Sequence, residues 1–464
     1  MEKRYGLLTA ISMVVGIVIG SGVFIKASKV LMLTGGNMFK SVAVIAIVGA
    51  IMIVCSLVFA ELGGRYEKVN GVVDYAEMAL GPNYAYYVGW FLAVIYYPCL
   101  VAILGWFASL FTCLLFNIEF FSGAHLAIGA MFVMFGYGIN ALSPKLGGRL
   151  QVSMTVIKLI PLLLMGIGGT IAGLVNGTTL DVLHTVTDTV GGSSGGGMIA
   201  AVCAFAFSYE GWIIATSINA ELKNAKRNLP IALVIGAVIC TAVYCLYVFS
   251  MSSVGSVDAI LDSGMMGVYL PRIAFSNLFG TVAGTVVYVF IIISCLGTMN
   301  GLIMGSCRGI YSVAVRNMGP NPEFFGDVDR QNNMCIKSSL VGMMLGGFWY
   351  FYTHVCWWCG NPDCFGTLNL PWWFNWEVDE ISICSLYAMY IPMFIALMVK
   401  GKELGFFKRF VLPSLAVIAS GFMVYCCYYA YRAHGQFWYY LIFFALVLFA
   451  GYLFHRFGGK KKPR

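Results

Sequence analysis

The chain has 464 residues, of which 60% are apolar and only 10% are charged, and its mean hydropathy is +0.85. Soluble proteins carry about 25% charged residues, so this composition indicates a polytopic α-helical membrane protein without a separate soluble domain. The net charge of +8 does not indicate nucleic-acid binding, because the basic residues fall in short loops and at the chain ends.

Apolar runs long enough to cross a bilayer, about 20 residues each, recur along the whole chain. They predict twelve transmembrane helices near 6–33, 40–63, 86–116, 124–142, 149–175, 197–222, 229–252, 281–316, 336–354, 381–399, 406–431 and 437–456. A short amphipathic helix that ends at Gly81-Pro82 is expected after the second span. The first run is too long for a cleavable signal, so none is expected.

The basic residues are distributed unequally between the two sides of the membrane. With the N-terminus inside, 22 of the 28 Lys and Arg residues fall on the cytoplasmic side, and Lys158 lies inside a span. The five on the external side are Lys26, Lys29, Lys40, Arg272 and Arg432. This asymmetry predicts a cell-membrane protein with both termini in the cytoplasm.

The first span contains Gly20, Ser21 and Gly22 at mid-depth. Glycine weakens a helix by roughly 1 kcal/mol relative to alanine, and amides freed by a helix break must face protein or a polar cavity. Amides at the start of a half-helix attract an anion such as a carboxylate. The alternative is close helix packing, because Gly16 and Gly20 also form a GxxxG pair.

Lys158 lies in the fifth span, nine residues past Arg149. That spacing places it roughly 13–14 Å along the helix, too deep for comfortable snorkelling. An ammonium at this depth needs a partner or a wet cavity, which predicts a functional residue. The alternative is a side chain that bends back to the cytoplasmic surface.

The sixth span carries Glu210 directly before Gly211. A carboxylate beside a glycine at mid-membrane predicts a second broken helix. The alternative is a structural ion pair or a protonated carboxyl group. Trp212 lies too deep for an interfacial anchor, so we expect it to line a cavity. In the eighth span, Asn300 is expected either to bond neighbouring helices or to line a pathway.

The connection between the ninth and tenth spans is rich in cysteine and tryptophan. His354, Cys356, Cys359 and Cys364 are residue types that bind zinc, but their spacing matches no common site. A disulfide within an aromatic external cap is expected instead. We expect no metal and no cofactor.

Two broken helices five spans apart are typical of two inverted five-helix repeats that hold substrate where the breaks meet. The chain resembles the L-type amino acid transporters of the amino acid–polyamine–organocation superfamily, especially their bacterial serine/threonine exchanger branch. The resemblance covers nearly the whole chain and rests on the segments Gly20-Ser-Gly-Val-Phe24, Ala60-Glu-Leu-Gly63, Gly81-Pro82, Lys158, Phe207-Ser-Tyr-Glu-Gly-Trp212, Glu221-Leu-Lys-Asn224, Asn228-Leu-Pro230 and Asn300-Gly301.

The resemblance implies an all-α leucine-transporter fold. Residues 1–175 would form the first inverted repeat, residues 176–400 the second, and residues 401–464 the two peripheral helices and a basic cytoplasmic tail.

The resemblance also implies a substrate site at the two breaks. Amides around Gly20, Ser21 and Gly22 would hold the substrate carboxylate, and carbonyls at Val18, Phe207, Ser208 and Glu210 would take its ammonium group. Phe207 would close over the substrate as a gate, and Trp212 and Asn300 complete the expected site. Lys158 would stand where sodium-coupled relatives bind sodium, bridging the first and fifth helices.

The sequence departs from the family pattern at two places, which limits the family properties that we infer for this chain. Glu67-Lys-Val-Asn-Gly71 replaces the usual turn after the second span, and the loop Asn117 to Ala124 has no cysteine. We therefore expect no disulfide-linked heavy chain.

The function expected from this resemblance is sodium-independent secondary transport, most simply exchange, of small neutral L-amino acids within a lipid bilayer. The alternatives are a cationic amino acid or polyamine transporter and a proton-coupled symporter of the same fold. No P-loop occurs in the sequence, and neither a channel nor an enzyme is expected.

Overall fold

The computed structural model describes residues 6–65, 71–179, 196–212, 222–254, 268–329, 334–359, 376–432 and 435–458. Apart from isolated β-bridges, such as that between Asp329 and Met334, the regular structure of these ranges is helical. Nine of the described helices are long and apolar enough to cross a membrane. The predicted all-α polytopic membrane fold is thus confirmed.

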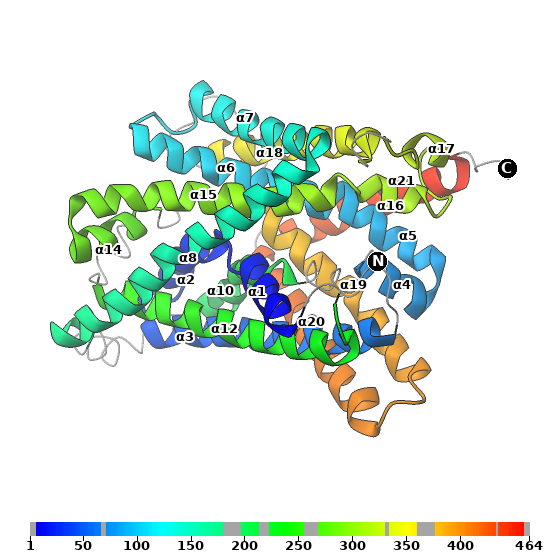
Figure 1. The fold of residues 1–464 in the computed structure, drawn as a ribbon, viewed down its shortest axis with the longest axis horizontal. Helices are drawn as coiled ribbons and strands as arrows, with labels where there is room; N and C mark the ends of the chain where they lie inside the picture. Colours follow the sequence, from blue (N-terminus) through cyan, green and yellow to red (C-terminus); the bar gives the residue numbers. More distant parts are fainter. Residues whose placement is uncertain are drawn as a thin grey trace. The chain divides into compact units, whose positions relative to one another are not determined.

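The chain divides into two compact units, and Figure 1 shows the helices that make them up. Unit 1 comprises residues 1–69, 155–294 and 397–430, and unit 2 comprises residues 70–154, 295–396 and 431–464. Four helices have residues in both units, namely α8 (Pro144–Val175), α15 (Thr281–Ser306), the last residues of α19 (Val378–Lys400) and the last residue of α20 (Leu412–Tyr431).

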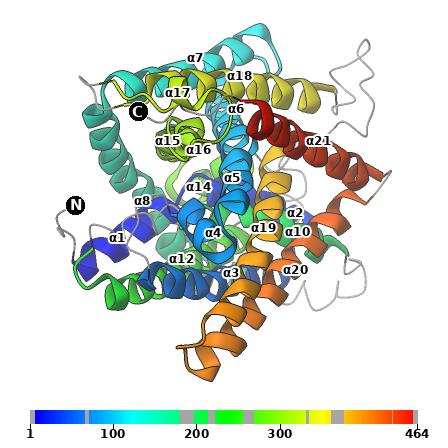
Figure 2. The same ribbon diagram turned by 90° about the vertical axis from the view of Figure 1, so that its right-hand side faces the viewer.

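Unit 1 contains the helices expected to carry the broken spans. Besides parts of α8 and α15, its elements are α1 (Leu7–Val18), α2 (Gly22–Leu33), α3 (Met38–Arg65), α10 (Gly196–Phe205), the 3₁₀ turn η2 (Ala206–Tyr209), α12 (Ala225–Val254), α14 (Leu270–Phe279), the π turn η6 (Phe407–Val411) and α20 (Leu412–Tyr431). The helix α12 packs along α3 and against α1, and α10 packs against α2 and α3 (Figure 2).

Unit 2 contains the remaining helices. They are α4 (Val72–Leu80), α5 (Pro82–Phe91), the π turn η1 (Leu92–Tyr96), α6 (Tyr97–Phe116), α7 (Gly123–Leu142), α16 (Gly309–Ala314), α17 (Pro322–Phe325), α18 (Ile336–Cys359), α19 (Val378–Lys400) and α21 (Gln436–Phe457). The helices α6, α7 and α18 pack side by side (Figure 1).

A proline explains one irregular backbone segment of unit 2. The π turn η1 runs directly into Pro98, which has no N–H to offer the carbonyl of Val94 four residues earlier. The indole Nε1 of Trp349, on α18, donates to this carbonyl at 3.1 Å. An unpaired carbonyl is costly inside a membrane, so the carbonyl of Val94 needs this donor. Because the donor lies on α18, the bond also links the irregular turn to the neighbouring helix.

The short helix predicted before Gly81-Pro82 is confirmed as α4. Gly81 has a φ of +91°, which ends α4, and Pro82 begins α5. Arg316 holds α4 within unit 2, because its guanidinium contacts the carboxylates of Asp74 at 2.5 Å and Glu77 at 3.1 Å.

Two features of the helices differ from the sequence analysis. The helix α14 was not predicted, although Pro271 near its start and Gly280 after its end are a helix start and a helix stop. The helix α18 continues to Cys359, beyond the predicted end at residue 354. Cys356 is buried and forms no disulfide, so the expected disulfide does not include it. Cys364 lies outside the described residues.

Candidate functional site

The first predicted helix break is present in unit 1. The helix α1 ends at Val18, Ile19 takes an extended conformation with ψ of 95°, and α2 begins at Gly22. Gly20 and Ser21 therefore lie between two half-helices, each of 12 residues. The first N–H groups of α2 have no acceptor within that helix, because a helical N–H donates to the carbonyl four residues earlier and those residues lie before the helix begins.

The second predicted break is also present. The 3₁₀ turn η2 follows α10, Glu210 is extended with ψ of 154°, and Gly211 has a φ of +104°. That φ is strained for a side chain bearing a β-carbon, which explains the glycine after Glu210. The backbone N–H of Glu210 donates to the carbonyl of Phe207 at 3.1 Å. Glu210 itself is 8% exposed.

The two breaks touch each other through their backbones. A β-carbon added to Gly22 would lie 2.6 Å from the Cα of Ser208 and 3.2 Å from Cδ1 of Phe207. No real β-carbon tolerates the shorter distance, and the atom it would meet is backbone. Gly22 is therefore required for contact between the breaks, and the site predicted from two distant stretches of sequence comes together there.

Polar groups without a protein partner gather at this contact. The hydroxyls of Ser21 and Ser208 are buried, and neither makes a hydrogen bond with the described residues. Among the described residues, no backbone carbonyl is recorded as accepting from the amides of Ser21 and Gly22. Buried donors are normally satisfied and amides at a helix start favour an anion, so these groups are suited to the predicted carboxylate site, which stays a prediction.

Tyr244, on α12, links the two breaks and was missed by the sequence analysis. Its hydroxyl lies 2.8 Å from the carbonyl of Val18 and 2.8 Å from that of Ser208. A hydroxyl has one proton, so it donates to one of these carbonyls at a time. Each carbonyl has two lone pairs, which leaves capacity for a substrate ammonium group. Thr241, Tyr244 and Tyr247 are three residues apart, so their hydroxyl groups lie along one side of α12. This spacing of polar residues within an apolar span is the sequence signal that could have identified Tyr244.

We expect Tyr244→Phe to reduce transport about tenfold while the protein still inserts and folds, because the two carbonyls lose a shared donor and a lost buried hydrogen bond costs ~1–3 kcal/mol. The measurement is initial exchange rate in proteoliposomes per inserted protein. Tyr247→Phe is the matched control, since the Tyr247 hydroxyl is buried on the same helix without a hydrogen bond to the described residues. Equal rates for the two variants would contradict the linking role of Tyr244.

Tyr209 fastens the second break to the surrounding helices of unit 1. Its hydroxyl lies 3.1 Å from the carbonyl of Ile45 on α3 and 3.0 Å from Oγ1 of Thr241 on α12. Gly49 leaves room for this arrangement, because an added β-carbon would lie 2.3 Å from Oγ1 of Thr241.

Lys158 is buried at 1% exposure on α8. Among the described residues, it makes no hydrogen bond with the carbonyls of the first break. Its predicted bridge to that break therefore stays a prediction.

Lys26, which the count of basic residues places on the external side, is buried in the structure. It lies one turn into α2 and its side chain has 0% exposure. Its Nζ is 5.9 Å from the ring centroid of Phe207, the expected gate residue, which is 6% exposed. The side of the membrane on which this lysine lies stays a prediction.

Asn300 and Trp212 occupy different parts of the molecule. Asn300 belongs to unit 2, where its Nδ2 donates to Gly147 O and to Gln151 Oε1 at 3.0 Å each, and its Oδ1 accepts from Asn140 at 2.7 Å. This is the helix-bonding arrangement, and a role in substrate binding stays a prediction. Trp212 is fully buried in unit 1, with its ring 5.5 Å from that of Phe59.

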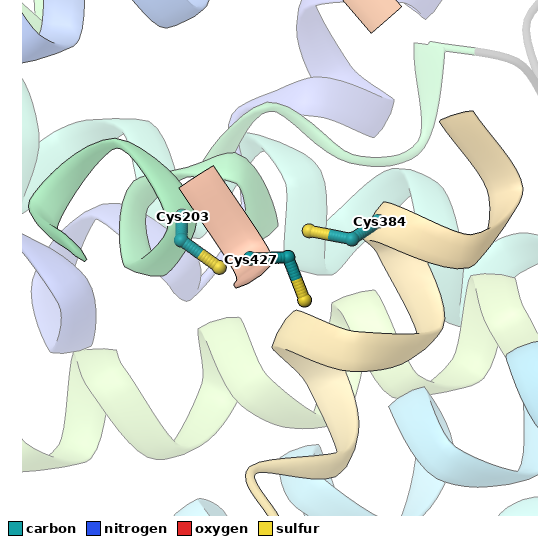
Figure 3. A group of neighbouring side chains, drawn as sticks. All are labelled: Cys203, Cys384 and Cys427. Carbon is teal, nitrogen blue, oxygen red and sulfur yellow. The ribbon is translucent and has the colours of Figure 1, made fainter. Parts of the chain in front are cut away.

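Two buried thiols of unit 1 lie near the second break. The sulfur atoms of Cys203 on α10 and Cys427 on α20 are within 4.8 Å of each other (Figure 3). Figure 3 also labels Cys384, which belongs to unit 2. Buried cysteines in helices commonly serve as small hydrophobic residues, and both thiols are buried.

Comparisons with known proteins bear on the whole chain. Residues 5–463 match a family described as amino acid permease. The serine/threonine exchanger SteT of Bacillus subtilis (strain 168) is 28% identical over 438 residues, which cover 91% of this chain and 91% of that protein.

Two animal relatives match over a shorter stretch. The b(0,+)-type amino acid transporter 1 of Mus musculus is 30% identical over 317 residues, or 67% of this chain and 62% of that protein. The cystine/glutamate transporter of Homo sapiens is 25% identical over 348 residues, or 74% of this chain and 66% of that protein. The match spans less than two thirds of each animal protein.

Proposed function

Because this chain belongs to the amino acid permease family, we propose that it is a sodium-independent exchanger of small neutral L-amino acids that works by alternating access. Amino acid transport follows from the family, and the relatives are transporters and not catalysts. The substrate class, the sodium independence and the exchange mode are the proposal. The serine/threonine exchanger among the relatives supports small neutral substrates.

The contact between the two helix breaks is the observation that carries this proposal. An amino acid has a carboxylate and an ammonium group one carbon apart. The amides and hydroxyl at Ser21 and Gly22 supply donors for the carboxylate, and the carbonyls of Val18 and Ser208 supply acceptors for the ammonium. Because Gly22 and Ser208 touch, both sets of groups are within reach of one small zwitterion.

The same contact supports alternating access. α2 begins at one break and η2 lies at the other, so a ligand that binds both breaks stabilises the arrangement in which they touch. A ligand shifts an equilibrium only by its difference in affinity for the two states. A zwitterion that contacts both breaks binds more tightly to the state in which the breaks touch than to a state in which they are apart. A zwitterion that contacts only one break binds both states equally.

The proposal includes the placement of the protein. We propose a cell-membrane location with both termini in the cytoplasm, on the basis of the unequal distribution of Lys and Arg. We also propose that no disulfide-linked heavy chain is required, because residues 117–124 contain no cysteine.

The test uses competition against labelled L-serine uptake into proteoliposomes loaded with unlabelled L-serine. Unlabelled L-serine should compete fully, whereas ethanolamine, its decarboxylated analogue, and N-acetyl-L-serine, which lacks the ammonium, should each compete at least about a hundredfold less well, or ~2.8 kcal/mol. Each analogue removes one of the two groups that the breaks are proposed to hold. Competition by ethanolamine equal to that of L-serine would reject the carboxylate site and favour the amine or polyamine alternative.

A further inference from the structure

We propose that the end of α21 and the turn at Pro320 form a binding site for an anionic phospholipid. One acyl chain lies in an apolar groove of unit 2, and the phosphate contacts the basic residues at and after the end of α21. The site belongs to unit 2, whereas the helix breaks belong to unit 1, and it does not depend on the proposed transport activity.

The groove is formed by two segments of unit 2 that are far apart in the sequence. Its volume is about 670 Å³, which lies within the range of pockets that hold small ligands. Pro320 and Asn321 contribute one wall, and the last turns of α21 contribute the other, chiefly through Leu453, Phe454, Phe457 and Gly458. The three large side chains recur at helical spacing, so they share one side of α21.

A second side of α21 is fixed to α5 by two hydrogen bonds. The hydroxyl of Tyr86 donates to the carbonyl of Gly451 at 2.7 Å, and the indole of Trp90 donates to the carbonyl of Val447 at 3.0 Å. The ring of Tyr86 also stacks on that of His455, with the centroids 4.9 Å apart. Because these contacts use a different side of the helix, they hold α21 in place and leave the groove side open.

Two glycines close one end of the groove. A β-carbon added to Gly458 would lie 2.3 Å from the carbonyl oxygen of Gly319, so the end of α21 and the turn before Pro320 are in backbone contact. Gly319 has a φ of +85°, which residues with a side chain rarely adopt. This contact brings the two walls together and makes the groove a part of the folded structure.

The groove side chains of α21 stay exposed within the protein. Leu453 is 39% exposed, Phe454 44% and Phe457 78%. Since α21 is long and apolar enough to cross a membrane, lipid hydrocarbon is the medium that covers such side chains. From Ala450 to Gly458 the groove follows about 12 Å of helix, which is close to the depth of one leaflet, half of the roughly 30 Å of hydrocarbon.

A run of basic residues begins where the groove ends. Arg456 is exposed and forms no ion pair with the described residues. The sequence continues with Lys460, Lys461, Lys462 and Arg464, and no acidic residue occurs among them. Clusters of Lys and Arg directly after a membrane span attract anionic lipid headgroups. The charge next to the groove therefore selects an anionic lipid over a neutral one.

The opposite wall of the groove does not supply this charge. In the segment that follows Asn321, Asp327 is paired with Lys337 at 2.9 Å, and Glu323 is exposed in the first turn of α17. An exposed carboxylate disfavours an anion, so the phosphate is placed at the basic end of α21 and not at α17. A soluble anion would meet the same basic residues but would leave the apolar groove unused.

The experiment measures lipid binding to the purified full-length protein by native mass spectrometry. Delipidated protein in maltoside detergent is titrated with dioleoylphosphatidylglycerol, which is anionic, or with dioleoylphosphatidylcholine, which has the same acyl chains and no net charge. The first phosphatidylglycerol should bind at least about tenfold more tightly than the first phosphatidylcholine, a difference of ~1.4 kcal/mol. Equal affinities would overturn the proposal without any variant.

A charge variant tests the basic end of the site. It combines Arg456→Gln, Lys460→Gln, Lys461→Gln, Lys462→Gln and Arg464→Gln, and it should lower the preference for phosphatidylglycerol to less than about twofold. The matched control also removes five positive charges, at exposed residues of unit 1, and should keep the preference of the parent. It combines Lys223→Gln, Lys226→Gln, Arg227→Gln, Lys400→Gln and Lys402→Gln. A preference that survives in the charge variant, or that is lost equally in the control, would overturn the proposal.

A groove variant tests the acyl-chain part of the site. Leu453→Ala combined with Phe457→Ala should weaken the binding of phosphatidylglycerol at least about fivefold, because apolar contacts with the chain are lost. The matched control combines Leu446→Ala with Phe449→Ala, which removes the same two residue types from exposed positions of α21 outside the groove. Equal binding by the two double variants would overturn the groove assignment. Where the groove variant is not stable in detergent, the parent and the charge variant still decide.

A soluble headgroup separates a lipid site from a phosphate site. An excess of sn-glycerol 3-phosphate should leave bound phosphatidylglycerol in place, because it offers no acyl chain to the groove. Displacement by this compound would show that the phosphate alone is recognised and would overturn the proposal of a lipid site. The binding measurements involve no transport, so a failure of L-serine uptake and a failure of lipid binding are distinguished.

Discussion

Gly22→Val should reduce amino acid exchange by more than about a hundredfold, or ~2.8 kcal/mol, without preventing membrane insertion. Already the first added carbon would lie 2.6 Å from the Cα of Ser208. The obstructing atom is backbone, so no rotation of a side chain relieves the clash, and valine adds two further methyl groups on a stiff β-branched side chain. The two breaks would be forced apart, and the groups proposed to bind carboxylate and ammonium would no longer share one ligand.

The measurement is initial exchange of labelled L-serine in proteoliposomes, normalised to correctly inserted protein. Gly421→Val is the matched control, because Gly421 lies in the transmembrane helix α20 and an added β-carbon there meets nothing within 4 Å. It should retain the parent rate. Gly22→Ala should already show most of the loss. If Gly22→Val retained more than half of the parent activity, contact between the breaks would not be required for transport.

Replacement of Lys158 by methionine should lower exchange at least about tenfold, and the parent should exchange at the same rate in sodium and choline buffers. Lys158 is buried within unit 1, and an ion about 6 Å from its ammonium would meet a repulsion of ~3 kcal/mol at an effective dielectric constant of 20. The resemblance to L-type transporters implies that this ammonium stands where sodium-coupled relatives bind the ion. The ammonium of Lys158 would then take the place of the bound sodium ion.

Methionine keeps the length of the lysine side chain and removes its charge, so the comparison isolates the ammonium. Lys402→Met, at an exposed position of unit 1, is the control and should behave as the parent. Thermal stability in detergent separates loss of function from loss of folding. Sodium stimulation of the parent by more than about threefold, or full activity of Lys158→Met, would reject this role.

The two compact units are not the two predicted repeats, because each unit takes segments from both halves of the chain. The broken helices, α1–α2 and α10–η2, fall in unit 1 together with the spans that follow them, α3 and α12. The fifth spans of the two halves differ, since most of α8 belongs to unit 1 and most of α19 to unit 2. The inverted repeat and its boundaries at residues 175 and 400 stay a prediction.

The helices and both breaks could be predicted from sequence, because their causes are local. Apolar runs of bilayer length specify spans, Gly20-Ser21-Gly22 cannot keep a regular helix, and Gly211 permits the positive φ that ends η2. The membrane depth expected for Lys158 followed from counting residues along a helix and stays a prediction, whereas its burial is observed.

The partners of these residues were decided only by tertiary structure, because they come from segments far apart in the chain. Tyr244 reaches Val18 across 226 residues and Ser208 across 36, and no local pattern states where its hydroxyl points. From the sequence, Asn300 was expected either to bond neighbouring helices or to line a pathway. Its hydrogen bonds with Asn140, Gly147 and Gln151 show that it bonds neighbouring helices. For Lys26 the sequence supplied only an expected side of the membrane, from the count of basic residues. Its burial near the ring of Phe207 comes from the packing of α2 against η2, on which a charge count along the chain contains no information.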